Sequence, residues 1–184
     1  MMKFEEEFKM FGLFKKKEPS IHIINKVWMN ENAKWNACLQ LLIENQNLVF
    51  VTWFEDTRKK LNELLEQHHH QHKVIMYRQA INSQKLNYVF AEHYPLYSKE
   101  VDLFKQLELT EVTILSSLDE PLFKQFGSEN LVPLLEKLGM QPNEMIEHNM
   151  ISSSIKRAQE KIAAKVLIEN TANNQADWLL KNMK

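Results

Sequence analysis

An acidic residue and a histidine stand side by side at Glu92 and His93, directly after the short apolar segment Tyr88 to Ala91. A carboxylate next to an imidazole can act as a general acid or base when a substrate reaches it. Tyr94 adds a phenol to the group. We therefore take Glu92, His93 and Tyr94 as candidates for a ligand site or catalytic site. A hydrogen-bonded pair with a purely structural role is the simpler alternative.

Four histidines, His68, His69, His70 and His72, form a second group of residues that could do chemistry, because imidazoles bind zinc. The i,i+4 spacing of His68 and His72 suits one helix face, but no glutamate follows in the pattern of a zinc protease. The group also falls where a helix should end, so we interpret it as a solvated helix terminus. The single cysteine, Cys38, has no partner in a motif. We expect neither a metal nor a cofactor.

Glycine is scarce, with only Gly12, Gly127 and Gly139 in the chain. A loop that wraps around phosphates needs glycine, because its backbone must approach the phosphate and adopt positive φ. No glycine lies between Gly12 and Gly127, so no phosphate-binding loop can be written there. The sequence predicts that this chain does not bind or hydrolyse ATP.

Five short β-branched or apolar segments predict strands, and most are separated by helical patterns. Asn30 is expected to cap a helix from Ala33 to Glu44, and Asp56 or Thr57 the next helix, to about Gln67. A third helix is expected from Ser98 to Leu107. This alternation predicts an α/β fold, with a mostly parallel sheet of about five strands and helices on both faces. The expected strands are 21–28, 48–54, 73–77, 88–91 and 112–116.

After Leu118 the pattern becomes entirely helical. We expect helices at 119–126, 129–138 and 142–147, then a long amphipathic helix from Asn149 to about Glu169 and a short one near Trp178. The long helix has an apolar stripe with little sheet left to cover it, which makes it a candidate surface for a protein partner or for self-association. The stripe consists of Ile151, Ile155, Ala158, Ile162 and Val166.

Residues 117–162 read SLDEPLFKQFGSENLVPLLEKLGMQPNEMIEHNMISSSIKRAQEKI. This segment resembles the region of the SecA preprotein translocase ATPase that leaves the second motor domain and enters the scaffold helix. The matching residues lie at Ser117–Glu120, Leu122, Phe126, Lys137–Met140, Glu144, Ile146–His148, Ile155, Ala158, Gln159 and Lys161. Ile23 to Leu65 resembles the start of the same motor domain more weakly.

The resemblance implies a P-loop-like, helicase C-terminal fold for residues 20–118 and a helical extension over 119–184. Glu92 and His93 are similar to acidic and histidine residues of the last helicase motif. The arginine- and glycine-rich run that should follow is absent, and Leu107 to Thr110 stands there instead. The resemblance therefore implies a degenerate motor domain, a non-catalytic protein-interaction module with a possible link to protein translocation. A small ligand-binding protein or enzyme that uses the sheet edge near Glu92 is the alternative.

The balance of charge, 23 Lys and Arg against 24 Asp and Glu, gives no indication of nucleic-acid binding. No apolar run is long enough to span a bilayer, and a single cysteine suits a reducing compartment. We therefore expect a cytoplasmic protein without stable membrane insertion. Residues 1–19 carry phenylalanines and a final run of lysines, and we interpret them as an amphipathic leader or a weak membrane-surface anchor.

Overall fold

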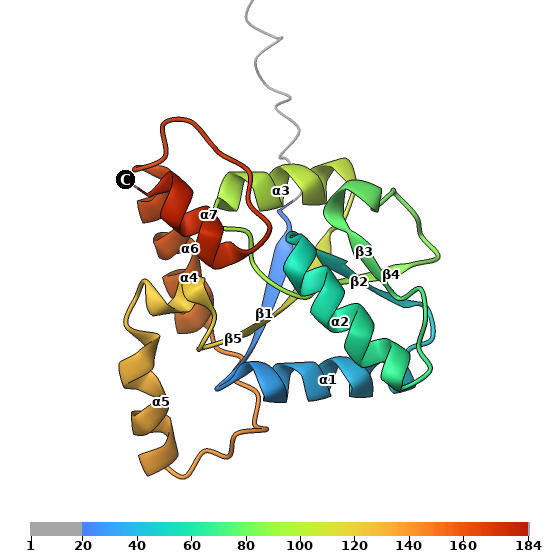
Figure 1. The fold of residues 1–184 in the computed structure, drawn as a ribbon, viewed down its shortest axis with the longest axis horizontal. Helices are drawn as coiled ribbons and strands as arrows, with labels where there is room; N and C mark the ends of the chain where they lie inside the picture. Colours follow the sequence, from blue (N-terminus) through green and yellow to red (C-terminus); the bar gives the residue numbers. More distant parts are fainter. Residues whose placement is uncertain (1–19, 184) are drawn as a thin grey trace, which may run out of the picture.

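A computed structural model describes residues 20–183, and in it five parallel strands form one sheet with helices on both faces (Figure 1). The order across the sheet is β1-β5-β4-β2-β3. All five predicted strands are present within two residues of their expected ends, so the α/β fold class is confirmed. The leader 1–19 lies outside the described residues. The strands are β1 (His22–Trp28), β2 (Leu48–Thr52), β3 (Val74–Met76), β4 (Asn87–Phe90) and β5 (Glu111–Ser117).

Helices α1 (Glu31–Glu44) and α2 (Glu55–Gln67) cover one face of the sheet. Strand residues point alternately to the two faces, so Leu48 and Phe50 of β2 pack with α1 and α2, and the intervening Val49 and Val51 pack on the opposite face. Asn30 accepts a hydrogen bond from the backbone N–H of Ala33, at 2.9 Å, so the predicted cap of α1 is confirmed.

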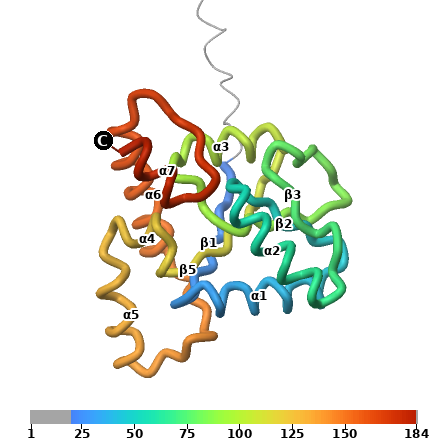
Figure 2. The backbone as a smooth tube through the Cα atoms, in the orientation of Figure 1, coloured from blue at the N-terminus to red at the C-terminus, as the bar shows by residue number. Residues whose placement is uncertain are grey.

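Helices α3 (Tyr97–Gln106), α6 (Asn149–Ala163) and α7 (Gln175–Asn182) cover the other face, together with the short α4 (Pro121–Lys124). Figure 2 shows the chain passing through α5 (Ser128–Lys137), which stands away from the sheet, before it returns in α6. The side chains of Ile162 and Trp178 are fully buried, at 1% and 0% exposure. The helical extension therefore shares one hydrophobic core with the sheet.

Two helix predictions need correction. Residues 142–147 form no helix, because Ile146 instead exchanges backbone hydrogen bonds of 3.0 and 2.7 Å with Val27 on the outer edge of β1. This bridge covers part of an otherwise open sheet edge. The long helix ends at Ala163 and not near Glu169, because the Glu169 carboxylate bonds back to Tyr94 and Trp178. Within residues 20–183 no helix is long and apolar enough to cross a bilayer.

Adjacent leucines of α7 provide a matched test of the shared core. Leu179 is 5% exposed and Leu180 is 77% exposed. We expect Leu179→Ala to lower the free energy of unfolding by about 2–5 kcal/mol, because it leaves a cavity between α7 and the sheet. The control Leu180→Ala should change it by less than about 0.5 kcal/mol. Urea unfolding measures both, and equal effects would show that α7 is not part of the core.

Candidate functional site

The carboxyl ends of β2 and β4 mark the place where this fold would bind a ligand. The chain leaves β2 toward β3 and leaves β4 toward β5, so the connections of these two neighbouring strands depart in opposite directions. Open parallel sheets bind ligands in the crevice at such a point. Trp53 and Phe54 follow β2 here, and Glu92 follows β4.

The Glu92 carboxylate lies across this crevice and caps α2. One oxygen accepts hydrogen bonds from the backbone N–H groups of Trp53 and Phe54, both at 2.9 Å, and the other accepts from the Thr57 hydroxyl at 2.6 Å. The predicted cap from Asp56 or Thr57 is therefore wrong, since Phe54 is the N-cap residue and has no side-chain cap bond. A helix N-terminus attracts anions, and here the anionic group is the Glu92 carboxylate of the same chain.

Glu92 is only 4% exposed, and this burial has an electrostatic consequence. Burial raises its pKa from 4.5 to about 7, against the opposing effect of the hydrogen bonds from Thr57 and Phe54 and of the Lys34 ammonium. The carboxyl group therefore exchanges its proton near neutral pH while it holds two strands and a helix together.

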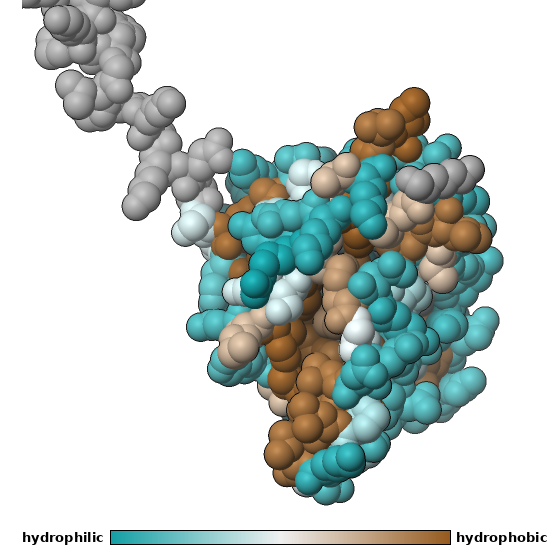
Figure 3. Space-filling view, turned by 90° about the vertical axis from the view of Figure 1, so that its left-hand side faces the viewer, coloured by the Kyte–Doolittle hydropathy of each residue, from teal (hydrophilic) through white to brown (hydrophobic). Residues whose placement is uncertain are grey.

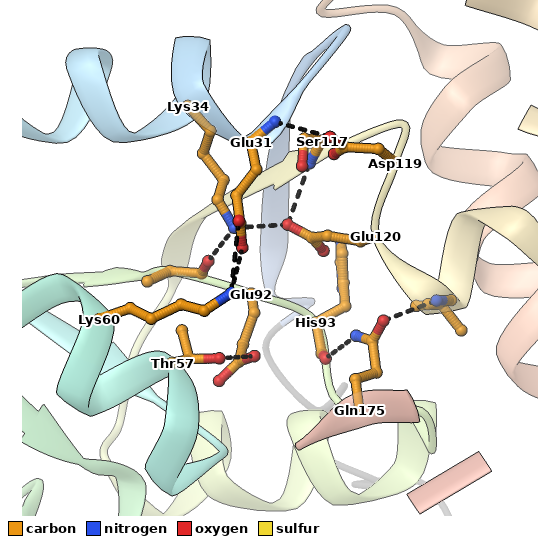
Figure 4. A network of polar contacts seen from close by, with 12 residues as sticks. Glu31, Lys34, Thr57, Lys60, Glu92, His93, Ser117, Asp119, Glu120 and Gln175 are labelled. Atoms are coloured by element: carbon orange, nitrogen blue, oxygen red, sulfur yellow. Dashed lines mark hydrogen bonds and ion pairs between the residues drawn. The ribbon is translucent and has the colours of Figure 1, made fainter. Parts of the chain in front are cut away.

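A buried ion pair adjoins Glu92 on the side of β5 (Figure 4). Lys34 of α1 donates to Glu120 at 2.5 Å and to the carbonyl of Ala91 at 3.1 Å, and Glu120 also accepts from the backbone N–H of Ser117. Burial lowers the pKa of Lys34, but the Glu120 carboxylate raises it by more, so the net direction is upward. The ammonium stays charged and fixes the start of α1 to the end of β5.

His93 is held by a second carboxylate and by the extension. Its Nδ1 lies 2.9 Å from Glu100 of α3, and Gln159 of α6 donates to the other oxygen of Glu100, at 2.9 Å. Gln175 of α7 donates to the carbonyl of His93 at 3.0 Å. The Nε2 atom of His93 is buried and meets no hydrogen-bond partner among the described residues. An imidazole held in this way is oriented like a base, and only 2% of it is exposed.

The three consecutive candidates therefore line three different cavities. Glu92 lines a polar cavity of about 340 Å³, His93 one of about 200 Å³, and Tyr94 one of about 580 Å³. The structure does not assemble the three side chains into one active site. Sequence reasoning missed Lys34, Glu100 and the two glutamines, although Lys34 and Gln159 each interrupt a buried helix face in the sequence pattern.

The structure places the four histidines in and after the last turn of α2, and Cys38 inside α1. His68 is the C-cap of α2, and His69 and His72 have positive φ, 62° and 60°, in the turn that follows. No cluster of metal-ligating side chains is present in the part of the chain that the structure describes. Cys38 is buried, and burial raises its pKa to about 12, so the thiol is unreactive.

Most of the apolar stripe predicted for the long helix is buried inside the chain. Ile155, Ala158 and Ile162 are 5% exposed or less and pack against the sheet, and Ile151 and Val166 are half-buried. This corrects the expectation of an exposed apolar stripe, because the sheet does have a face left to cover it.

An apolar groove lies instead between α4, α5 and the first turns of α6, with a volume of about 520 Å³. Exposed side chains line it, among them Phe126, Leu134 and Met150, which are 42%, 52% and 71% exposed. Figure 3 shows the corresponding apolar band across the lower part of the face that carries α4 and α5. Ile151 and Ile155 of the predicted stripe contribute to the lining.

Comparison with known proteins finds SecA. A stretch of 46 residues, 25% of this chain, is 50% identical to the protein translocase subunit SecA of Bacteroides thetaiotaomicron. The SecA of Chlorobium phaeobacteroides strain BS1 is 36% identical over 76 residues, 37% of this chain. The matches cover 4% and 7% of those SecA chains, so this chain corresponds to a small part of its curated relatives. No family profile matches the chain. Part of this chain is therefore similar to SecA.

The buried state of Glu92 makes stability depend on pH. Its pKa is raised in the folded chain, so its contribution is present at low pH and is lost as the pH rises through 7. We expect the free energy of unfolding to fall by about 2 kcal/mol between pH 5.5 and 8.5 from this group. Glu92→Gln should remove that part of the slope, because an amide carries no charge at these pH values. Its oxygen can still accept from Trp53 and Phe54, and its NH2 group would donate to the Thr57 hydroxyl, reversing that bond.

The control for this titration is Glu63→Gln, which changes an exposed carboxyl group on α2, the helix whose start Glu92 contacts. It should keep the pH dependence of the unaltered chain. Glu120, whose pKa burial also raises, contributes with the same sign and remains in all three proteins. Chemical unfolding at several pH values measures the slopes, and identical slopes for the unaltered chain and Glu92→Gln would contradict the assignment.

Proposed function

We propose that this chain is a non-catalytic protein-interaction module, related to a part of SecA, that works in connection with protein translocation. The observation that carries the proposal is the apolar groove between α4, α5 and α6, which exposes Phe126, Leu134 and Met150. Contiguous exposed apolar surface is typical of protein–protein contact sites. The similarity to SecA over 25–37% of the chain supports the link to translocation.

The hydrogen bonds that Glu92 makes in the ligand crevice support a role without nucleotide chemistry. Phosphoryl transfer needs backbone N–H groups, a metal ion and cations around the phosphates. Here the N–H groups of Trp53 and Phe54 already bind the Glu92 carboxylate, which would repel a phosphate. The nearest buried cation, Lys34, is neutralised by Glu120. The sheet edge thus retains the architecture of a nucleotide-binding fold, while its polar groups are used to hold the fold together.

The proposed occupant of the groove is the apolar face of one helix of a partner protein. Three helices form the groove, and its lining is largely apolar, with Ser128, Asn130 and Ser154 as polar members. A surface of this shape and composition suits a helix that inserts side chains at positions i, i+3 or i+4, and i+7.

The groove can be tested with a fluorescent amphipathic peptide that has leucines at this spacing, alongside a scrambled peptide of the same composition. We expect saturable binding of the first peptide only, measured by fluorescence anisotropy. Leu134→Asp should weaken it at least about tenfold, because a charge would be buried against apolar groups. Ile43→Asp, at an exposed position on α1, is the control and should bind normally.

The link to translocation needs a separate test in cells that produce the chain. A photoreactive amino acid in place of Leu134 should form an adduct with a component of the protein translocation machinery, and one in place of Ile43 should not. Mass spectrometry identifies the adducts. Adducts at Leu134 with unrelated proteins only would contradict the link, and equal binding of both peptides would contradict the groove.

A further inference from the structure

The cavity that Tyr94 lines is separate from the groove and from the polar cavity that Glu92 lines. It has a volume of about 580 Å³, within the range of roughly 300–1,000 Å³ found for small-molecule sites. It lies at the carboxyl end of the sheet, beside the residues that follow β2, β3 and β4. Parallel sheets hold ligands at this end.

Aromatic rings from three neighbouring strand ends meet at this cavity. Trp53 directly follows β2, Tyr77 directly follows β3, and Tyr94 lies four residues after β4. The ring of Trp53 lies 4.9 Å from the ring of Tyr77 and 4.9 Å from that of Tyr94, between centroids. Tyr77 and Tyr94 are only half-buried, so this wall offers aromatic surface to a ligand.

A buried donor belongs to the same wall. Trp53 is 5% exposed, and its indole N–H has no acceptor among residues 20–183. A buried polar group without a partner is costly, and native structures usually supply one. The unpaired indole N–H is therefore a donor that an acceptor of a bound ligand could satisfy.

Charges of both signs line the cavity in equal number. Arg78 lies over the Tyr77 ring, at 5.4 Å, and Lys99 lies 3.6 Å from Glu169. Asp102, one turn after Lys99 on α3, adds the second carboxylate. A ligand with a single charge would be attracted by the two side chains of opposite sign and repelled by the two of like sign. A ligand with one charge of each sign can satisfy both.

We propose that this cavity binds a small aromatic zwitterion of the aromatic amino acid type. The aromatic ring packs against Tyr77 and Tyr94. The carboxylate of the ligand pairs with Arg78, and its ammonium group pairs with Asp102. This cavity shares no lining residue with the groove. A negative result for ligand binding here would therefore leave the proposed protein-binding function untouched.

Three compounds with the same indole ring separate the charge requirement from simple apolar binding. L-Tryptophan is zwitterionic, indole-3-propionate is anionic and tryptamine is cationic at pH 7. Isothermal titration of the whole chain should show saturable binding of L-tryptophan, with each of the others weaker by about tenfold or more. Absence of saturable L-tryptophan binding up to about 10 mM, or equal affinity for the three compounds, would overturn the proposal.

Two variants and a control test the residues. Tyr77→Ala should weaken all three compounds, because it removes the aromatic surface that they share. Arg78→Ala should weaken L-tryptophan and indole-3-propionate by about tenfold and should not weaken tryptamine, because the guanidinium repels its ammonium group. Arg58→Ala, which removes a guanidinium paired with Glu55 and absent from the lining, should bind all three as the unaltered chain does. Unchanged binding by Tyr77→Ala would contradict the assignment, and thermal unfolding checks that each variant is folded.

Discussion

The carboxylate of Glu92 is the interaction on which this structure depends. At the carboxyl edge of a parallel sheet, the start of a helix presents unpaired N–H groups that need an acceptor. Glu92 supplies it for Trp53 and Phe54, and so joins the end of β4 to the end of β2 and to the start of α2. In a nucleotide-binding protein an anionic ligand fills this kind of position. In this chain the Glu92 carboxylate takes the place of such a ligand.

Other polar side chains at this edge of the sheet also join separate elements of the fold. Lys34 and Glu120 join α1 to β5, and Glu100 with Gln159 joins α3 and α6 around His93. Each of these side chains is buried and makes at least one hydrogen bond or ion pair within the chain, so each holds elements of the fold together. Two surface features differ in kind from the cavities that Glu92 and His93 line: an apolar groove on α4 to α6 and an aromatic cavity beside Tyr94.

The sequence predicts the local parts of this fold well and its long-range contacts poorly. The apolar run from Leu48 to Val51 is short and rich in β-branched residues, which favours a buried strand, and Asn30 caps the helix that begins beside it. The bond from Glu92 to Trp53 joins residues 39 positions apart, which no local pattern reveals. For the same reason the sequence predicts a helix through Ile146, whereas in the structure Ile146 forms a β-bridge with the distant Val27. The sequence identifies Glu92, His93 and Tyr94 as candidates, but it does not show that they line three different cavities. That separation depends on contacts with α2, α3 and α6.

A single measurement tests most directly whether the chain itself occupies the ligand crevice. Isothermal titration of the purified chain with ATP and magnesium ions, at pH 8 where Glu92 is largely ionised, should give no saturable binding at nucleotide concentrations up to about 1 mM. Saturable binding in that range, weakened by Thr57→Ala, would place a phosphate where we place the carboxylate and would contradict this account.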